Sequence, residues 1–320
     1  MNVASPLPFK PLDGAKFRHP DVTAKGERRA AVALERLATL WFNTGTLCNI
    51  TCRNCYIESS PTNDRLVYLS AAEAAEYLDE IAALALGTGE IGFTGGEPFM
   101  NPDIIAMLEE ALRRGFRVLV LTNAMKPMEH HKRALLGLKA RFGAKLCLRV
   151  SLDHYGPALH EAERGPRTWA PTLDGLKWLS ANGFNLNVAG RTSAGDGEPA
   201  LRAGYARLFA AEGIRVDARD PVQLVLFPEM DARVDVPEIT EACWDILNKR
   251  PDAMMCATSR MVVKRQGVER PAVVSCTLLP YDPQFELGER LRQAMGAVKL
   301  NHPHCAKFCV LGGGSCSAQT

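Results

Sequence analysis

The sequence has no long hydrophobic run, no marked excess of charge and no export signal. Its longest apolar stretches, such as Ala82–Leu86 and Val222–Phe227, are far shorter than the roughly 20 residues of a membrane helix. The 38 Lys+Arg nearly balance the 36 Asp+Glu, so nothing draws the chain to nucleic acid or to an anionic membrane. The first residues, MNVASPLPFKPLDG, are broken by prolines and lack an apolar segment. We therefore expect a soluble, cytoplasmic protein that binds neither membranes nor nucleic acid.

The sequence also lacks internal repeats and low-complexity segments. Hydrophobic residues make up 47% and charged residues 23%, which excludes a disordered or fibrous chain. A length of 320 residues suits one large domain, or a mid-sized domain with an appendage.

Short apolar runs alternate with amphipathic segments between about Leu37 and Leu226. The runs predict strands, and the segments, with apolar residues at three-to-four spacing, predict helices. The predicted strands are Leu37–Phe42, Glu90–Thr94, Arg117–Thr122, Lys145–Ser151, Asn185–Ala189 and Val222–Leu226. The predicted helices are Ser70–Leu86, Pro102–Arg114, Met128–Phe142, Thr168–Asn182 and Glu198–Glu212. Such β-α units predict an α/β fold with a parallel sheet, either an open barrel or a doubly wound sheet.

The pattern changes after about Phe227, where prolines punctuate the chain. Two strand-like runs, Arg260–Lys264 and Ala272–Ser275, and one helix near Gly288–Val298 are predicted there. We expect three parts: an N-terminal arm over 1–36 with a short helix near Gly26–Ala38, a barrel over 37–227, and a small cysteine-dependent domain over 228–320.

The ten cysteines are clustered. Cys48, Cys52 and Cys55 lie together, Cys147 stands alone in an apolar run, and the last quarter of the chain holds Cys243, Cys256, Cys276, Cys305, Cys309 and Cys316. Disulfide scaffolds are usually small, secreted and loop-rich, and this chain is none of these. Clustered thiols in a reducing compartment indicate metal or cluster ligation.

The first cluster, Cys48-x3-Cys52-x2-Cys55, directly follows the first predicted strand. Three thiolates can each coordinate a different iron of a [4Fe–4S] cluster and leave the fourth iron open. A structural zinc site usually takes four ligands, and no fourth Cys or His lies nearby.

With Gly95-Gly96-Glu97-Pro98 after the second predicted strand, this motif resembles the radical S-adenosylmethionine (radical SAM) superfamily. The resemblance covers about Leu37 to Leu226 and implies a partial (β/α)6 TIM-type barrel. It also implies that S-adenosylmethionine binds the open iron. An electron from an external flavodoxin- or ferredoxin-type reductant then cleaves it to a 5′-deoxyadenosyl radical, which abstracts a substrate hydrogen.

The resemblance assigns cofactor contacts to several further residues. Gly95 and Gly96 permit close backbone approach, Glu97 accepts hydrogen bonds from the ligand's ammonium, and Pro98 stiffens the exit from the strand. Later strand ends add Asn123, Ser151 and Arg191 near the methionine and ribose portions. The family often has an aromatic residue before its third cysteine, whereas this chain has Asn54 there and Tyr56 after it.

The second cluster, Cys256, Cys276, Cys305, Cys309 and Cys316, resembles the SPASM or shorter twitch extension of radical SAM enzymes. The resemblance implies one auxiliary [4Fe–4S] cluster. Zinc is the alternative, because His302 and His304 flank Cys305 and mixed N/S sites suit zinc. Cys243 is either a sixth ligand or a small buried hydrophobe, and Cys147 is expected to be a small buried hydrophobe.

Three functions remain open at this point. The first is an oxidoreductase-like radical SAM enzyme that modifies a peptide or protein side chain. The second is a radical SAM dehydrogenase or rearrangement enzyme that acts on a small metabolite in cofactor or natural-product biosynthesis. The third, a non-catalytic iron–sulfur electron carrier, does not explain the GGEP motif. Only about 36 residues precede the first predicted strand, so we expect a peptide substrate to bind directly in the barrel or through a separate recognition protein.

Overall fold

The computed structural model describes residues 10–192, 197–228 and 231–314. Its main feature is a nine-stranded sheet of order β10-β9-β8-β2-β3-β4-β5-β6-β7. Six consecutive strands in it are parallel: β2 (Thr39–Asn43), β3 (Glu90–Thr94), β4 (Arg117–Thr122), β5 (Leu146–Ser151), β6 (Asn185–Arg191) and β7 (Leu224–Phe227). Because each strand pairs with the next one in the chain, the sheet never reverses its order, and the partial (β/α)6 barrel is confirmed.

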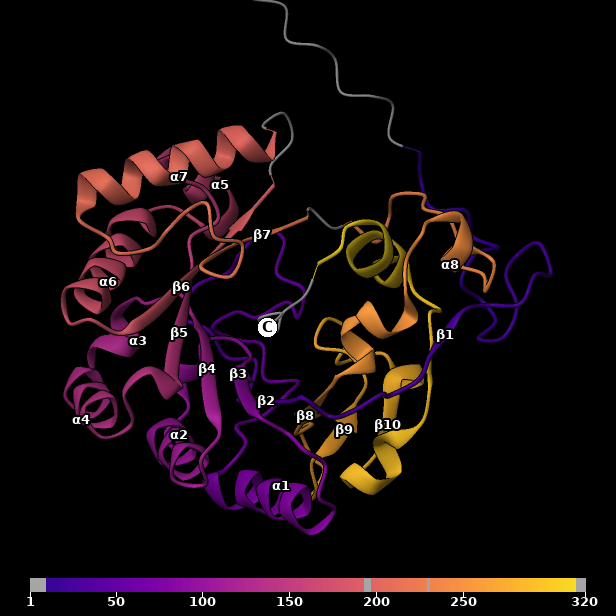
Figure 1. Ribbon diagram of the computed structural model, residues 1–320, viewed down its shortest axis with the longest axis horizontal. Coiled ribbons are helices and arrows are strands. Elements are labelled where there is room, and N and C mark those ends of the chain that lie inside the picture. Colours follow the sequence, from indigo (N-terminus) through magenta and orange to yellow (C-terminus); the bar gives the residue numbers. More distant parts are fainter. Residues whose placement is uncertain (1–9, 193–196, 229–230, 315–320) are drawn as a thin grey trace, which may run out of the picture.

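Helices cover the outer face of these strands (Figure 1). They are α1 (Ala71–Ala83), α2 (Ile104–Arg113), α3 (Lys126–Glu129), α4 (Lys132–Phe142), α5 (Pro157–Arg164), α6 (Trp169–Ala181) and α7 (Glu198–Glu212). One predicted helix is divided: the segment from Met128 to Phe142 contains the end of α3 and all of α4. Helix α5 was not predicted from the sequence.

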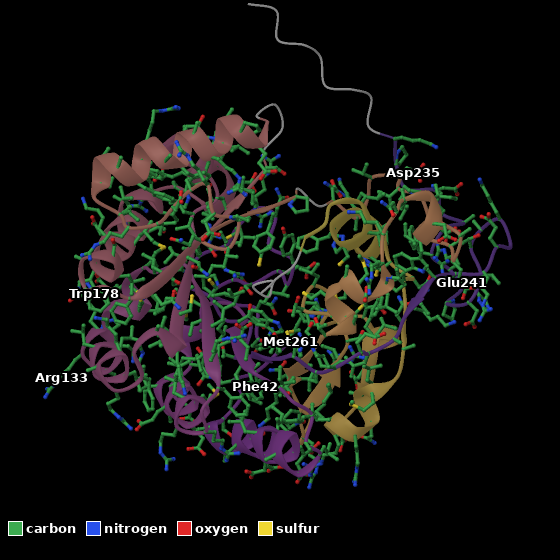
Figure 2. The ribbon with its side chains drawn as sticks, viewed as in Figure 1. Phe42, Arg133, Trp178, Asp235, Glu241 and Met261 are labelled. Carbon is green, nitrogen blue, oxygen red and sulfur yellow. The ribbon has the colours of Figure 1, made fainter. Side chains whose placement is uncertain are left out.

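Side chains alternate between two cores because successive residues of a strand point to opposite faces. Phe42 and Phe93 belong to the core between the sheet and the helices. Trp41 and Leu119 belong to the core inside the barrel, which they share with Met261 and the C-terminal segment. Figure 2 shows Phe42 and Met261 in the interior and Trp178 at the edge of the helical layer.

The C-terminal segment continues the barrel sheet. Strand β8 (Ser259–Val263) pairs in parallel with β2, and β9 (Ala272–Val274) and β10 (Glu286–Gly288) follow as antiparallel strands. The two predicted strand-like runs are therefore confirmed. The predicted helix near Gly288–Val298 is wrong in most of its length, since only Leu291–Met295 is helical, as a 3-10 turn.

The N-terminal arm packs on the C-terminal segment. Its predicted helix near Gly26–Ala38 is wrong, because β1 (Ala31–Val32) pairs there with β11 (Val298–Lys299). The guanidinium of Arg29 is fully buried, 2.5 Å from a carboxylate oxygen of Glu238, and also donates to the carbonyls of His19 and Val22. This long-range pairing is invisible to local sequence patterns.

Other short elements complete this part of the chain. Helix α8 (Cys243–Ile246) lies near the arm, and 3-10 turns span Pro251–Ala253, Met255–Ala257 and Pro283–Phe285. A π-helix spans Cys305–Leu311. In the described residues, no helix combines the length and apolar character needed to span a membrane.

Candidate active site

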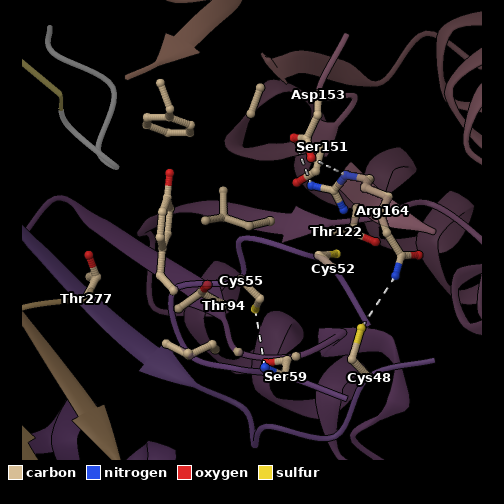
Figure 3. A pocket seen from close by; sticks show the side chains of 18 of the residues that line it. Cys48, Cys52, Cys55, Ser59, Thr94, Thr122, Ser151, Asp153, Arg164 and Thr277 are labelled. Carbon is tan, nitrogen blue, oxygen red and sulfur yellow. Dashed lines mark hydrogen bonds and ion pairs between the residues drawn. The ribbon is translucent and has the colours of Figure 1, made fainter. Parts of the chain in front are cut away.

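A cavity of about 1080 Å³, measured to its open mouth, lies at the C-terminal ends of the parallel strands. The three cysteines of the first cluster, Gly95 and Gly96 line it, together with residues that end β4, β5 and β6. Figure 3 shows Ser151, Asp153 and Arg164 grouped on one side of the cavity and Thr277 on the other. The cavity occupies the position where barrels of this type bind ligands.

The loop with the three cysteines is anchored at several points. The Cys48 amide donates to the Ser60 carbonyl at 3.0 Å, and the Arg53 amide donates to the carbonyl of Glu163 at the end of α5 at 2.7 Å. The Ser59 amide donates to Cys55 Sγ at 3.3 Å. Backbone bonds on both sides of the loop therefore hold the three thiols at one wall of the cavity.

Burial raises the pKa values of two of these thiols, and nearby positive charge opposes this effect at one of them. Burial raises the pKa of Cys48 to about 12 and also raises the pKa of Cys52, while the nearby Arg164 guanidinium acts to lower the pKa of Cys52. In the metal-free protein these two thiols are protonated at neutral pH. Cluster binding therefore requires that protons leave as the thiolates bind iron.

The two glycines of the GGEP motif lie where no side chain fits. Gly95 has φ +135°, and a Cβ there would lie 2.5 Å from the Gly45 carbonyl oxygen. At Gly96 a Cβ would lie 2.1 Å from the Leu47 carbonyl oxygen. The glycines thus permit contact between the end of β3 and the start of the cysteine loop, in addition to facing the cavity.

Glu97 is buried, and its carboxylate accepts bonds from within the protein. Thr122 Oγ1 and the Asn123 amide donate to it at 2.8 Å, and the Phe99 amide donates at 3.2 Å. Burial raises its pKa to about 7, although these bonds act in the opposite direction. Neither Glu97 nor Pro98 is among the cavity-lining residues, so a bond from Glu97 to a ligand ammonium stays a prediction.

A buried charge network forms the polar side of the cavity. Arg164 Nε lies 3.0 Å from a carboxylate oxygen of Asp153, and Arg191 Nε lies 3.6 Å from the other. Asp153 has a lowered pKa because the two arginines outweigh the effect of its burial. Two guanidinium groups against one carboxylate leave a net positive charge beside Cys52, which suits an anionic group.

The predicted contacts at the later strand ends converge on the same cavity. Asn123, Ser151 and Arg191 all line it. Asn123 Nδ2 donates to Asn49 Oδ1 at 2.9 Å and approaches Cys48 Sγ at 3.9 Å. Which atoms of a cofactor these three residues contact stays a prediction.

Asn54 and Tyr56 have different surroundings. The Asn54 side chain donates to Glu163 at 2.9 Å, and Asn54 is not among the cavity-lining residues. Tyr56 lines the cavity, and the Arg191 guanidinium lies 4.9 Å from its ring centroid.

The C-terminal cysteines lie close behind the opposite wall. Cys256, Cys276 and Cys305 are near enough to influence one another electrostatically, and Cys309 follows one turn after Cys305 in the π-helix. Burial raises the pKa of Cys256 to about 11 and that of Cys305 well above its usual range. Cys316 lies outside the described residues.

Of the described cysteines in this cluster, Cys256, Cys276, Cys305 and Cys309, none lines the cavity, but their neighbours do. Thr277 and Leu278 follow Cys276, Phe308 precedes Cys309, and all three line the cavity. The cavity is therefore bounded by the first cysteine cluster on one side and by neighbours of the second on the other.

The remaining predicted ligands have other contacts. The ring centroids of His302 and His304 lie 4.6 Å apart, and the His304 backbone amide donates a hydrogen bond to His302 Nδ1. The backbone amide of Thr240 donates to Cys243 Sγ at 3.3 Å. Within the described ranges, no three Cys, His, Asp or Glu side chains converge as the ligands of a single metal ion do.

Three cavity residues were not predicted from the sequence: Arg164, Phe227 and Phe308. Arg164 ends α5, whose start at Gly156-Pro157 and end at Gly165 were readable as cap signals. Phe227 and Phe308 carried no local signal, because only the tertiary fold brings the two rings together, with centroids 5.7 Å apart.

Comparisons with known proteins agree with this geometry. The sequence model of the Radical SAM superfamily matches residues 42–200. The bacteriocin subtilosin biosynthesis protein AlbA of Bacillus subtilis is 31% identical over 143 residues, which are 44% of this chain and 30% of AlbA. An AdoMet-dependent heme synthase of Methanosarcina barkeri is 27% identical over 147 residues, which are 44% of this chain and 38% of that protein. The matches thus span less than half of each relative.

Solved structures share the fold at low identity. SuiB of Streptococcus suis bound to its precursor peptide SuiA aligns with a TM-score of 0.58 at 12% identity, over 80% of this chain and 63% of SuiB. The AdoMet-bound protein anSMEcpe aligns with a TM-score of 0.55 at 13% identity, over 80% of this chain and 79% of that one. With the motifs and the cavity, these matches lead to one assignment. The chain belongs to the radical SAM superfamily, as an enzyme with a SPASM-type extension whose cofactors are a [4Fe–4S] cluster and S-adenosylmethionine.

Proposed function

We propose that this enzyme modifies a side chain of a peptide or protein, with an auxiliary cluster in the C-terminal segment. One observation carries the proposal: a single cavity is bounded both by the first cysteine cluster and by Thr277, Leu278 and Phe308 next to the second. AlbA, which acts in bacteriocin biosynthesis, and SuiB, which was solved with a precursor peptide, support a peptide substrate.

The cavity residues fit the cofactors of the family. Cys48, Cys52 and Cys55 would hold the first [4Fe–4S] cluster, and their number leaves one iron open. When bound, the cluster and S-adenosylmethionine supply a one-electron cleavage that yields a hydrogen-abstracting radical. The protein's part is to bind and orient: Gly95 and Gly96 let the end of β3 pack against the start of the cysteine loop, and Arg164 supplies positive charge for an anionic group.

The second set of thiols would hold an auxiliary [4Fe–4S] cluster. We assign Cys276, Cys305, Cys309 and Cys316 to it, and Cys256 is a further candidate. Such a cluster can accept an electron from an oxidised substrate or bind the substrate at an open iron. An external one-electron reductant of the flavodoxin or ferredoxin type completes the proposed set of partners.

A small-metabolite substrate is the second candidate. It is favoured by the AdoMet-dependent heme synthases among the relatives, at 26–27% identity. Both candidates use the same first cluster, so they differ only in what enters the cavity.

Mass spectrometry of candidate substrates separates the two. Anaerobically reconstituted enzyme is incubated with S-adenosylmethionine, dithionite and synthetic peptides from the short reading frames that flank its gene. We expect one peptide to change mass, and Cys52→Ala to abolish the change. Turnover of a tetrapyrrole heme precursor with every peptide unchanged would contradict a peptide substrate.

A further inference from the structure

Arg260 carries a buried positive charge that has no carboxylate partner among the described residues. Its side chain belongs to β8 and is only 1% exposed. The guanidinium donates hydrogen bonds to four backbone carbonyls, those of Cys256 at 2.6 Å, Ser259 at 2.8 Å, Ala294 at 2.8 Å and Gly296 at 3.0 Å. These carbonyls satisfy its hydrogen bonds, but they carry no net charge that offsets its own. A buried cation of this kind is costly unless an anion accompanies it.

The buried Arg29 shows the usual arrangement, because its guanidinium lies against the carboxylate of Glu238. Arg260 differs. Within the described part of the chain, the thiol of Cys256 is the one ionisable group whose charge acts on Arg260. The charge of Arg260 is therefore balanced only when the Cys256 sulfur is a thiolate, which is the form that binds iron.

Cys256 belongs to the group of thiols in the C-terminal segment. Together with Cys276 it acts electrostatically on the buried Cys305, so the three sulfurs lie in one neighbourhood. A [4Fe–4S] cluster held by four thiolates is an anion, and its one-electron reduction adds a further negative charge. A fixed cation beside such a cluster offsets the added charge and therefore favours the reduced form.

Building on the auxiliary cluster of the proposed function, we propose that Arg260 is the buried counter-cation of that cluster and acts on it through the ligand Cys256. Arg260 thereby raises the reduction potential of the auxiliary cluster. The four carbonyls hold the guanidinium in one place, so its charge is already oriented before the cluster takes up an electron. Cys256 then takes one of the four ligand positions, in place of one cysteine assigned above.

Two substitutions at position 260 separate the charge from the hydrogen bonds. Arg260→Gln and Arg260→Lys both lose part of the guanidinium fork, but only Arg260→Lys keeps the charge. Each variant is reconstituted anaerobically, and its iron content and the reduction potentials of both clusters are measured, the latter by electron paramagnetic resonance. We expect Arg260→Lys to keep about eight irons and the wild-type potentials. Arg260→Gln should make reduction of the auxiliary cluster about tenfold less favourable, which is about 59 mV for one electron, or should lose that cluster.

Arg292 is the matched control, because it lies on the turn that supplies the Ala294 carbonyl but is exposed. Arg292→Gln should leave both potentials unchanged, since solvent screens an exposed charge. If Arg260→Lys and Arg260→Gln behave alike, or if Arg260→Gln shifts both clusters equally, the proposal is overturned and Arg260 is a structural hydrogen-bond donor. With about eight irons in the wild type, that result leaves the proposed function intact. About four irons in the wild type would overturn the auxiliary cluster and this inference together.

Discussion

At Gly96 the chain has no room for a side chain. A Cβ would lie 2.1 Å from the Leu47 carbonyl oxygen, and backbone cannot yield as a flexible side chain can. The motif was readable in the sequence, but its contact with the cysteine loop was not, since this contact depends on where the loop folds back.

We expect Gly96→Ala to destabilise the protein by about 2 kcal/mol through overpacking, measured by urea unfolding. Gly137 in α4 is the matched control, because a Cβ there would meet nothing within 4 Å. Gly137→Ala should be neutral or stabilising by up to about 1 kcal/mol. Equal stability of the two variants would show that a Cβ at position 96 does not clash with the cysteine loop.

His160 is a titratable group that does not line the cavity. It is fully buried in α5, and within the described part of the chain neither of its ring nitrogens has a hydrogen-bond partner. Burial lowers its pKa to about 4, and the nearby Arg164 acts in the same direction.

This lowered pKa predicts a loss of stability in acid. Between about pH 6.5 and pH 4 the unfolded chain binds a proton at this histidine and the folded chain does not, so stability falls as the pH falls. His160→Phe should remove up to about 1.4 kcal/mol per pH unit from that slope, measured by urea unfolding between about pH 5 and pH 7. An unchanged slope would show that folding does not lower the pKa of His160.

Helix α5 is the element that sequence periodicity did not show. It has only eight residues and one fully buried side chain, so it presents too few apolar positions for a helical pattern. Yet it carries Arg164 to the cavity and holds the cysteine loop through the Glu163 carbonyl. The longer helices were predictable because each buries a full apolar face. Ser70 and Glu73 form a capping box at the start of α1.

Arg164→Gln should destabilise the protein by about 3–5 kcal/mol, because it leaves the buried Asp153 carboxylate with only the more distant Arg191. The double variant Asp153→Asn/Arg164→Gln should recover part of this loss, since no uncompensated charge then remains. Both are measured by urea unfolding. Strictly additive losses in the double variant would show that the pair is not energetically coupled.

On the scale of the whole molecule, the N-terminal arm and the C-terminal segment pair with residues far away in the sequence, and no local pattern reveals these contacts. The C-terminal strands extend the barrel sheet at β2, and the N-terminal arm pairs with β11. The parallel sheet was predictable from alternating strands and helices, whereas the pairing of residues far apart in the chain depends on tertiary packing. The boundaries at 36 and 227 stay a proposal.

Two adjacent arginines test the role of the arm. Arg29 is fully buried with Glu238, while Arg28 is exposed beside Glu241. Arg29→Ala should cost about 3–5 kcal/mol, and Arg28→Ala less than about 0.5 kcal/mol. Arg29→Ala should increase the rate of amide hydrogen exchange in residues 233–241 and 298–300 and leave the rate in β3 to β6 unchanged. Uniform acceleration throughout the chain would contradict a local role for the arm.

The most direct test of the two-cluster account is the iron, sulfide and zinc content of anaerobically reconstituted protein. Wild type is compared with the triple variant Cys48→Ala/Cys52→Ala/Cys55→Ala. The account predicts about eight irons in the wild type, about four in the variant, and no zinc in either. If the wild type holds about four irons and one zinc, and the triple variant keeps only the zinc, the C-terminal site is a structural zinc module. Iron content unchanged by the triple substitution would contradict the assignment of the first cluster, and with it the account as a whole.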